Sequence, residues 1–397
     1  MIIATRSGQI EISDDIYRGI FETSIVSDHA YYLESIKNGH ISLSRLIDLC
    51  RQGRLSYALF FGSSAVVLPM IERETAKIFD GFDGEHGISV RGGRMIRLSA
   101  VRLLIKDIKL KQDAVTRFIN TDKNPHVKYL KNSKRPLADQ AECVVDKLGI
   151  SMDDYRSFTK KGDALWYIVS KLEENNIFVS FENTGTNMPQ NFKRADGLTG
   201  VYVRHSKFPY FFISKEGLAN PENIPARKVF TLMYLTVCLF KGKSKMVSLQ
   251  QTIEEGSDEI YEIVELILMP KNLIPHKSTY TIEILDDIAA SLNVTPLALL
   301  VRLRHLEYID LDVFRSLRSE LFRRYSVFKD QQKREREEQD KKFRPNKVNN
   351  IRIYQGKAFL RILRDQFIAG KIKRREVNRQ LAYGKGSVDI DKVFEKL

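Results

Sequence analysis

The side chains that most often bind metal ions or attack substrates are few and scattered in this sequence. Its seven histidines occur singly: no two are two or four positions apart, the spacings that place two imidazoles on one face of a strand or a helix. The three cysteines are also far apart, so the sequence has no CxxC metal motif and no disulfide framework. Each of these residues is therefore expected to lie on the surface or in a packed core. They are Cys50, Cys143, Cys238, His29, His40, His86, His126, His205, His276 and His305.

One cysteine lies in the most apolar stretch of the chain, residues 226–240, which read ARKVFTLMYLTVCLF and carry no charge after Lys228. A run of about a dozen apolar residues is too short to cross a bilayer, which needs roughly 20. The length suits a buried core helix. Apolar surroundings raise the pKa of a thiol and reduce its reactivity, so we expect Cys238 to be a structural residue and not a nucleophile.

Basic side chains are concentrated in the C-terminal part of the sequence. Residues 301–397 contain 26 Lys or Arg and 14 Asp or Glu, whereas residues 1–300 contain 38 and 36. The net charge of +14 is therefore nearly all C-terminal. Such a surface can bind nucleic acid or an acidic partner, although basic helix faces are commonly only solvated. The densest group is Lys371, Lys373, Arg374 and Arg375.

Helices are expected to surround a small central sheet. Residues 177–182, IFVSFE, are β-branched and aromatic and predict a strand, and two more short strands are expected around Pro209. The apolar stretch 226–240 follows these strands. Apolar repeats and capping residues predict the other helices, within residues 13–53, 99–119, 138–149, 163–176, 257–270, 281–309, 320–344 and 355–384.

The order and spacing of these segments resemble the ImmA/IrrE-like metallopeptidases. In that family an Arg precedes FTLAHELGHLL, and here Phe230, Thr231 and Leu232 match its FTL. The later segments EIYEIVELILMP and TPLALLVRLRHLEYI are similar to two further family helices, and QGKAFLRILRDQFIAGKIKRREVNRQL is similar to a family tail. The likeness covers most of residues 13–397, is best from about residue 160 onward, and is weak at the N-terminus.

This resemblance implies a zinc-binding motif in which the two histidine ligands and the general base are replaced. It places Tyr234 and Cys238 at the two zinc-binding histidines, Leu235 at the general-base glutamate, and Glu259 at the acidic third ligand. A catalytic zinc needs three protein ligands and a general base that activates the bound water. Leucine cannot transfer a proton, a step worth about 10²- to 10⁴-fold in rate. We therefore expect no catalytic residues, no bound metal and no other cofactor.

The expected fold is α+β and mostly helical, with a zincin-like central domain that contains a small sheet of about three strands. Helical units flank this domain on both sides. The phrase NGHISLSRLIDLCRQGRLSYALFF is similar to the second half of a prokaryotic helix-turn-helix domain, without a convincing recognition helix before it. The expected units are a degenerate helix-turn-helix-like domain at 1–64, a helical connecting region at 65–150, a pseudo-peptidase domain at 151–319 and a basic helical region at 320–397.

The resemblance implies a non-enzymatic pseudo-metallopeptidase that binds a protein in a bacterial or phage mobile-element, toxin–antitoxin or defence system. A repressor, toxin or antitoxin is the expected kind of partner. Two alternatives stay open, namely a nucleic-acid-binding regulator that uses the basic C-terminal helices and an active metallopeptidase with non-standard ligands. The sequence shows neither a secretory signal nor a membrane span, so a cytoplasmic location is expected.

Overall fold

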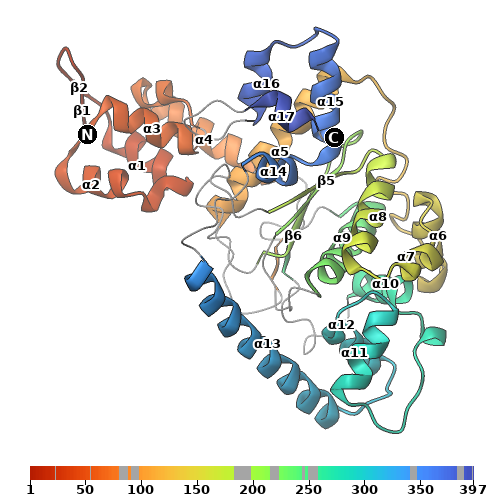
Figure 1. Cartoon of the computed structure of the whole chain (residues 1–397). Helices are drawn as coiled ribbons and strands as arrows, with labels where there is room; N and C mark the ends of the chain where they lie inside the picture. Colours follow the sequence, from red (N-terminus) through yellow and green to blue (C-terminus); the bar gives the residue numbers. More distant parts are fainter. Residues whose placement is uncertain are drawn as a thin grey trace.

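The computed structural model describes residues 1–22, 24–53, 55–79, 88–90, 98–182, 198–214, 223–243, 246–248, 258–339, 347–381, 389–395 and 397. These residues form a mostly helical α+β protein, as the sequence predicts. Figure 1 shows an N-terminal unit at one side and a central sheet between two groups of helices. Two hydrophobic cores run through the molecule, one on each face of that sheet.

The N-terminal unit combines helices with a three-stranded sheet of order β2-β1-β3. Its helices lie where the sequence predicts them. One of them ends at Gly39, a glycine that follows the helical pattern in the sequence and so predicts a left-handed cap, and its φ is 72°. The strands were not predicted, because three residues are too few to show an alternating pattern. The elements are β1 (Ile2–Ala4), β2 (Gln9–Glu11), α1 (Asp14–Glu22), α2 (Ala30–Asn38), β3 (His40–Ser42) and α3 (Leu43–Gly53).

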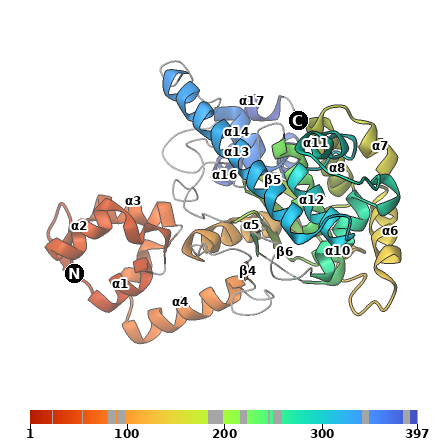
Figure 2. The same ribbon diagram turned by 90° about the horizontal axis from the view of Figure 1, so that it is seen from below.

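Two helices lead from this unit to the central sheet. A short 3-10 helix, Tyr57–Phe61, precedes α4 (Ser64–Phe79), and α5 (Leu98–Phe118) then packs on the sheet. Figures 1 and 2 both show α4 between the N-terminal unit and the remainder of the protein.

The central sheet has five strands in the order β4-β8-β6-β7-β5. Strands β6 and β7 form an antiparallel pair, and β5 lies parallel to β7 at one edge. The sheet is larger than the roughly three strands expected, because two three-residue strands extend its other edge. Every residue of β5, β6 and β7 is buried. The strands are β4 (Ile88–Val90), β5 (Phe178–Phe181), β6 (Gly200–Val203), β7 (Tyr210–Ile213) and β8 (Met246–Ser248).

Helices cover one face of this sheet and build the first core. Helix α9 lies closest to the sheet, since a β-carbon added to Gly200 would come within 2.9 Å of the Thr231 side chain. Glycine at this position of β6 therefore permits the close approach of α9. The neighbouring helices are α6 (Leu137–Leu148), α8 (Lys161–Glu174), α9 (Ile224–Lys241) and α10 (Glu259–Leu268).

Three further helices follow on this side: α11 (Ile282–Ser291), α12 (Pro296–His305) and α13 (Leu311–Gln339). In Figure 1 the long α13 extends along the outside of the molecule. Arg324 of α13 forms ion pairs with Glu283 and Asp286 of α11. Among the described residues no single helix is long and apolar enough to cross a membrane, and only α11 with α12, bent by 99°, passes that test as a pair.

The C-terminal helices cover the opposite face together with α5. They are α14 (Lys347–Gln355), α15 (Lys357–Ile368), α16 (Arg374–Leu381) and α17 (Ile390–Phe394). Tyr354 packs edge-on against Phe212 of β7, with 6.1 Å between ring centroids. The second core therefore draws on segments from both ends of the chain, and the C-terminal region shares its packing with the sheet.

The tightest contact of the C-terminal helices is at Gly356, between α14 and α15. Its φ is 81°, and an added β-carbon would lie far inside van der Waals distance of the Val179 carbonyl oxygen on β5. We expect Gly356→Ala to lower the free energy of unfolding by about 2–5 kcal/mol, because its φ of 81° and ψ of 141° form a conformation that essentially only glycine adopts and because the added β-carbon would overpack the contact. Chemical denaturation measures this loss.

Gly370 supplies the matched control. It has a φ of 70°, and nothing lies within 4 Å of the β-carbon that alanine would add. Gly370→Ala should therefore cost only the conformational strain, about 1–2 kcal/mol. Equal losses for the two variants would show that the close approach of Gly356 to β5 adds nothing to the cost of the alanine side chain.

Candidate functional site

The site that the sequence singles out lies on α9, which is a buried helix along its length. Pro225 stands in the first turn, where its missing N–H costs nothing, and Gly242 ends the helix with a φ of 74°. Every residue from Val229 to Lys241 is buried. A helix that is apolar on all sides is packed on all sides, and the prediction of a core helix is confirmed.

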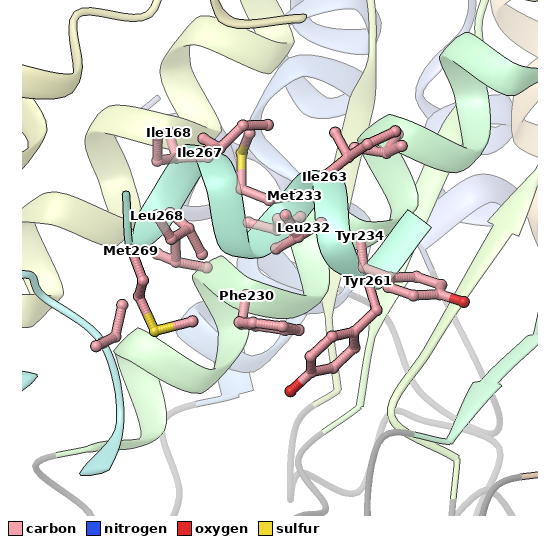
Figure 3. Close-up of a cluster of buried hydrophobic side chains, with 14 of the residues drawn as sticks. Ile168, Phe230, Leu232, Met233, Tyr234, Tyr261, Ile263, Ile267, Leu268 and Met269 are labelled. Carbon is pink, nitrogen blue, oxygen red and sulfur yellow. The ribbon is translucent and has the colours of Figure 1, made fainter. Parts of the chain in front are cut away.

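Tyr234 lies at the junction of α9 with α10. Its hydroxyl donates a hydrogen bond of 2.5 Å to Oδ2 of Asp258, while Oδ1 of Asp258 accepts the Ile260 N–H at 2.6 Å. Asp258 is the N-cap of α10, where a carboxylate satisfies an otherwise unpaired backbone donor. Figure 3 shows the hydroxyls of Tyr234 and Tyr261 directed away from the apolar cluster formed by the two helices.

Glu259 does not lie opposite Tyr234. Its Oε1 is 2.5 Å from Nζ of Lys241, and its side chain is 46% exposed. Lys241 is the last residue of α9, two helical turns beyond Tyr234 and about 10 Å away along the axis. The structure thus brings Asp258 to Tyr234 and Glu259 to Lys241. The sequence analysis assigned the acidic position to Glu259 and not to Asp258, although an aspartate before an apolar helix is a recognisable capping signal.

Leu235 and Cys238 are both completely buried. Leu235 faces the sheet, since its Cδ1 lies 3.3 Å from the position that a β-carbon on Gly200 would take. Burial separates both side chains from water, which a general base or an open metal position must contact. Across the described ranges, no three His, Cys, Asp or Glu side chains are grouped so that they could hold a metal ion.

A second polar cluster, which sequence reasoning missed, joins α10 to α12. Glu265 is fully buried, with its carboxylate 3.2 Å from Nη1 of Arg302 and 2.9 Å from Nδ1 of His305. Nε of Arg302 also donates to the Met269 carbonyl at 3.2 Å, near the end of α10. The signal in the sequence is a glutamate on the otherwise apolar face of a helix. A buried carboxylate with two partners fixes the orientation of α12 against α10.

The hydrogen bond of Tyr234 gives a direct test of this geometry. We expect Tyr234→Phe to lower the free energy of unfolding by about 2 kcal/mol, because a hydrogen bond to a charged group contributes roughly 1.5–3 kcal/mol. Thr231→Val is the comparison, since the Thr231 hydroxyl donates a hydrogen bond to the Arg227 carbonyl within α9 and does not connect two helices. Denaturation of the two variants measures both effects, and an unchanged stability in Tyr234→Phe would contradict the bond to Asp258.

The basic residues predicted as a nucleic-acid surface lie together in another part of the protein. Lys371 and Lys373 are in the connection between α15 and α16, and Arg374 and Arg375 begin α16. All four side chains are exposed. Arg374 is engaged at 2.8 Å by Asp391 of α17.

Comparison of the chain with protein-family models, with curated proteins and with solved structures gives no match.

Proposed function

We propose that this chain is a non-catalytic, metallopeptidase-like protein that acts by binding a partner protein. Its setting would be a regulatory, toxin–antitoxin or defence system in the cytoplasm of a bacterium or phage-infected cell. The sheet, α9 and α10 would correspond to a zincin-like centre. The observation that carries the proposal is the complete burial of Leu235 and Cys238 on α9.

Each of the four motif positions has a structural role in place of a catalytic one. Leu235 packs on the sheet, Cys238 fills the core, Tyr234 bonds to the cap of α10, and Glu259 pairs with the end of α9. A peptidase would need these positions to face a substrate and a bound water. Here they hold two helices and a sheet together, which suits a scaffold for recognition.

The segment that leads from the N-terminal unit to the central sheet offers exposed anchors for a partner. Within fourteen residues, four large apolar side chains are exposed, at fractions of 54% for Tyr57, 47% for Phe61, 66% for Val66 and 40% for Met70. Single exposed apolar residues are ordinary, but Val66 and Met70 are four positions apart in α4 and therefore lie on one side of that helix. We call these four residues the 57–70 surface. Its aromatic members are of the type that anchors protein interfaces.

Affinity capture from the host, read by mass spectrometry, tests this proposal. The tagged wild-type protein should retain one protein in stoichiometric amount. Replacing all four residues of the 57–70 surface with serine should abolish that retention. A control variant replaces Leu273, Val327, Ile353 and Ile368, which are equally exposed apolar residues elsewhere, and should retain the partner. Absence of a stoichiometric protein, or equal retention by both variants, would contradict the proposal.

A further inference from the structure

The helices α15 and α16 form a pair whose outer side is strongly basic. Phe359, Leu360 and Leu363 bury α15 in the second core, and Val377 and Leu381 bury the inner side of α16. Five residues connect the two helices, and Gly370 turns the chain there with a φ of 70°. The first helix is thus held in the core, while the connection and the start of the second helix project outward.

Four basic side chains project from this pair and are called the basic surface: Lys371, Lys373, Arg375 and Arg379. All are exposed, and none forms an ion pair within the described part of the chain. Among the nearby acidic groups, Asp391 binds Arg374 and Asp389 binds Lys392. Glu376, which lies between Arg375 and Arg379 in the sequence of α16, accepts the backbone N–H of Lys373 at 2.8 Å. Residues 347–397 as a whole carry 13 Lys or Arg against 5 Asp or Glu.

We propose that the basic surface binds double-stranded DNA. A helix held in the core, a short turn and a second helix with an exposed N-terminal half is the arrangement that places a helix in the major groove. Arg375 and Arg379 lie four positions apart on the outer side of α16, and guanidinium groups suit both phosphates and guanine edges. Lys371 and Lys373 precede them and would contact phosphates. This inference does not depend on the proposed protein partner.

The composition of the segment favours a duplex over other partners. Residues 368–381 contain no aromatic residue, whereas proteins that bind single strands stack bases on aromatic rings. Protein interfaces surround their arginines with aromatic and other apolar residues, whereas Ile368, 76% exposed, is the only large apolar side chain that the described part of this segment exposes. Charge and hydrogen-bond donors are what the surface offers, and both match the DNA backbone.

Fluorescence anisotropy with a labelled 30-base-pair duplex of random sequence tests the proposal. Each phosphate contact adds about 0.9 to the slope of log affinity against log salt, so four contacts should weaken binding about 100-fold between 50 and 200 mM salt. Replacing Lys371, Lys373, Arg375 and Arg379 with glutamine should weaken binding by at least about 100-fold at 50 mM salt and remove that part of the slope.

A control variant removes the same charge from another exposed site, by replacing Lys123, Lys131, Lys134 and Arg135 with glutamine. It should keep wild-type affinity within about threefold. Both variants alter only exposed side chains, and equal melting temperatures would verify that they fold. The proposal is overturned if wild type does not bind the duplex at 50 mM salt or if the two variants lose affinity equally. Tighter binding to a single strand of the same length, or to anionic vesicles, would overturn it too.

Discussion

Leu235→Glu is expected to lower the free energy of unfolding by about 4 kcal/mol or more at pH 8. Leu235 is fully buried between α9 and the sheet. A carboxyl group placed there has its pKa raised by burial, and shifts of 3–5 units correspond to roughly 4–7 kcal/mol. The substitution places a glutamate at the position where the proposed metallopeptidase-like centre would need its base. A large loss of stability would therefore show that this position is part of the core.

The pH dependence of the same variant separates burial from other causes. Because the folded-state pKa of the new glutamate is raised, the group is favourable when protonated, and its cost grows as the pH rises through that pKa. The destabilisation relative to wild type should therefore be smaller at pH 5 than at pH 8. Leu235→Met, which keeps the volume, should cost less than about 1.5 kcal/mol at both values. A pH-independent loss below about 1 kcal/mol in Leu235→Glu would mean that the side chain reaches water.

Lys111→Met is expected to be similarly severe, at about 3–5 kcal/mol, because it leaves a buried carboxylate without its ion pair. Nζ of Lys111 lies 3.2 Å from Oδ2 of Asp107, and both side chains are only 3% exposed. The same ammonium contacts the Tyr354 carbonyl and lies 4.4 Å from the Tyr354 ring centroid. The Tyr354 hydroxyl in turn donates to Asp107 at 3.0 Å. This cluster joins α5 to the C-terminal helices inside the second core.

A double variant distinguishes the loss of the ion pair from the loss of packing. Asp107→Leu/Lys111→Met removes both charges and should be more stable than Lys111→Met alone. The single tryptophan, Trp166, provides a second readout, since Nζ of Lys357 lies 4.4 Å from its ring centroid. If the C-terminal helices detach, Trp166 fluorescence should change before the global transition. A double variant as unstable as the single one would contradict this interpretation.

The central helix was the part of the site that the sequence predicted best. The run from Phe230 to Phe240 is long enough for a helix, too short for a membrane and uniformly apolar, and these properties alone predict burial on every side. The glycine cap after α2, Gly39, was also predicted, because glycine in a left-handed conformation follows many helices. Local patterns of this kind depend on neighbouring residues only.

The contacts between distant segments could not be predicted in this way. The pairing of Glu259 with Lys241, and of Asp258 with Tyr234, depends on the rotation of α10 against α9, which side-chain packing sets. The three-residue strands β1 to β3 carry too few residues for a periodic pattern. The ion pair between Asp107 and Lys111 is visible in the sequence as an i, i+4 pair, but its burial depends on helices more than 230 residues away.

Elemental analysis of the protein, purified without chelators and then equilibrated with equimolar zinc, tests most directly the proposal that this metallopeptidase-like chain is non-catalytic. Leu235, Cys238, Tyr234 and Glu259 all have structural roles, so we expect less than about a tenth of an equivalent of zinc per chain after gel filtration. The melting temperature should be the same with and without zinc, because a ligand that binds only the folded state raises stability. One tightly held zinc per chain, with a melting temperature that rises on zinc addition, would contradict the proposal and favour an active site with non-standard ligands.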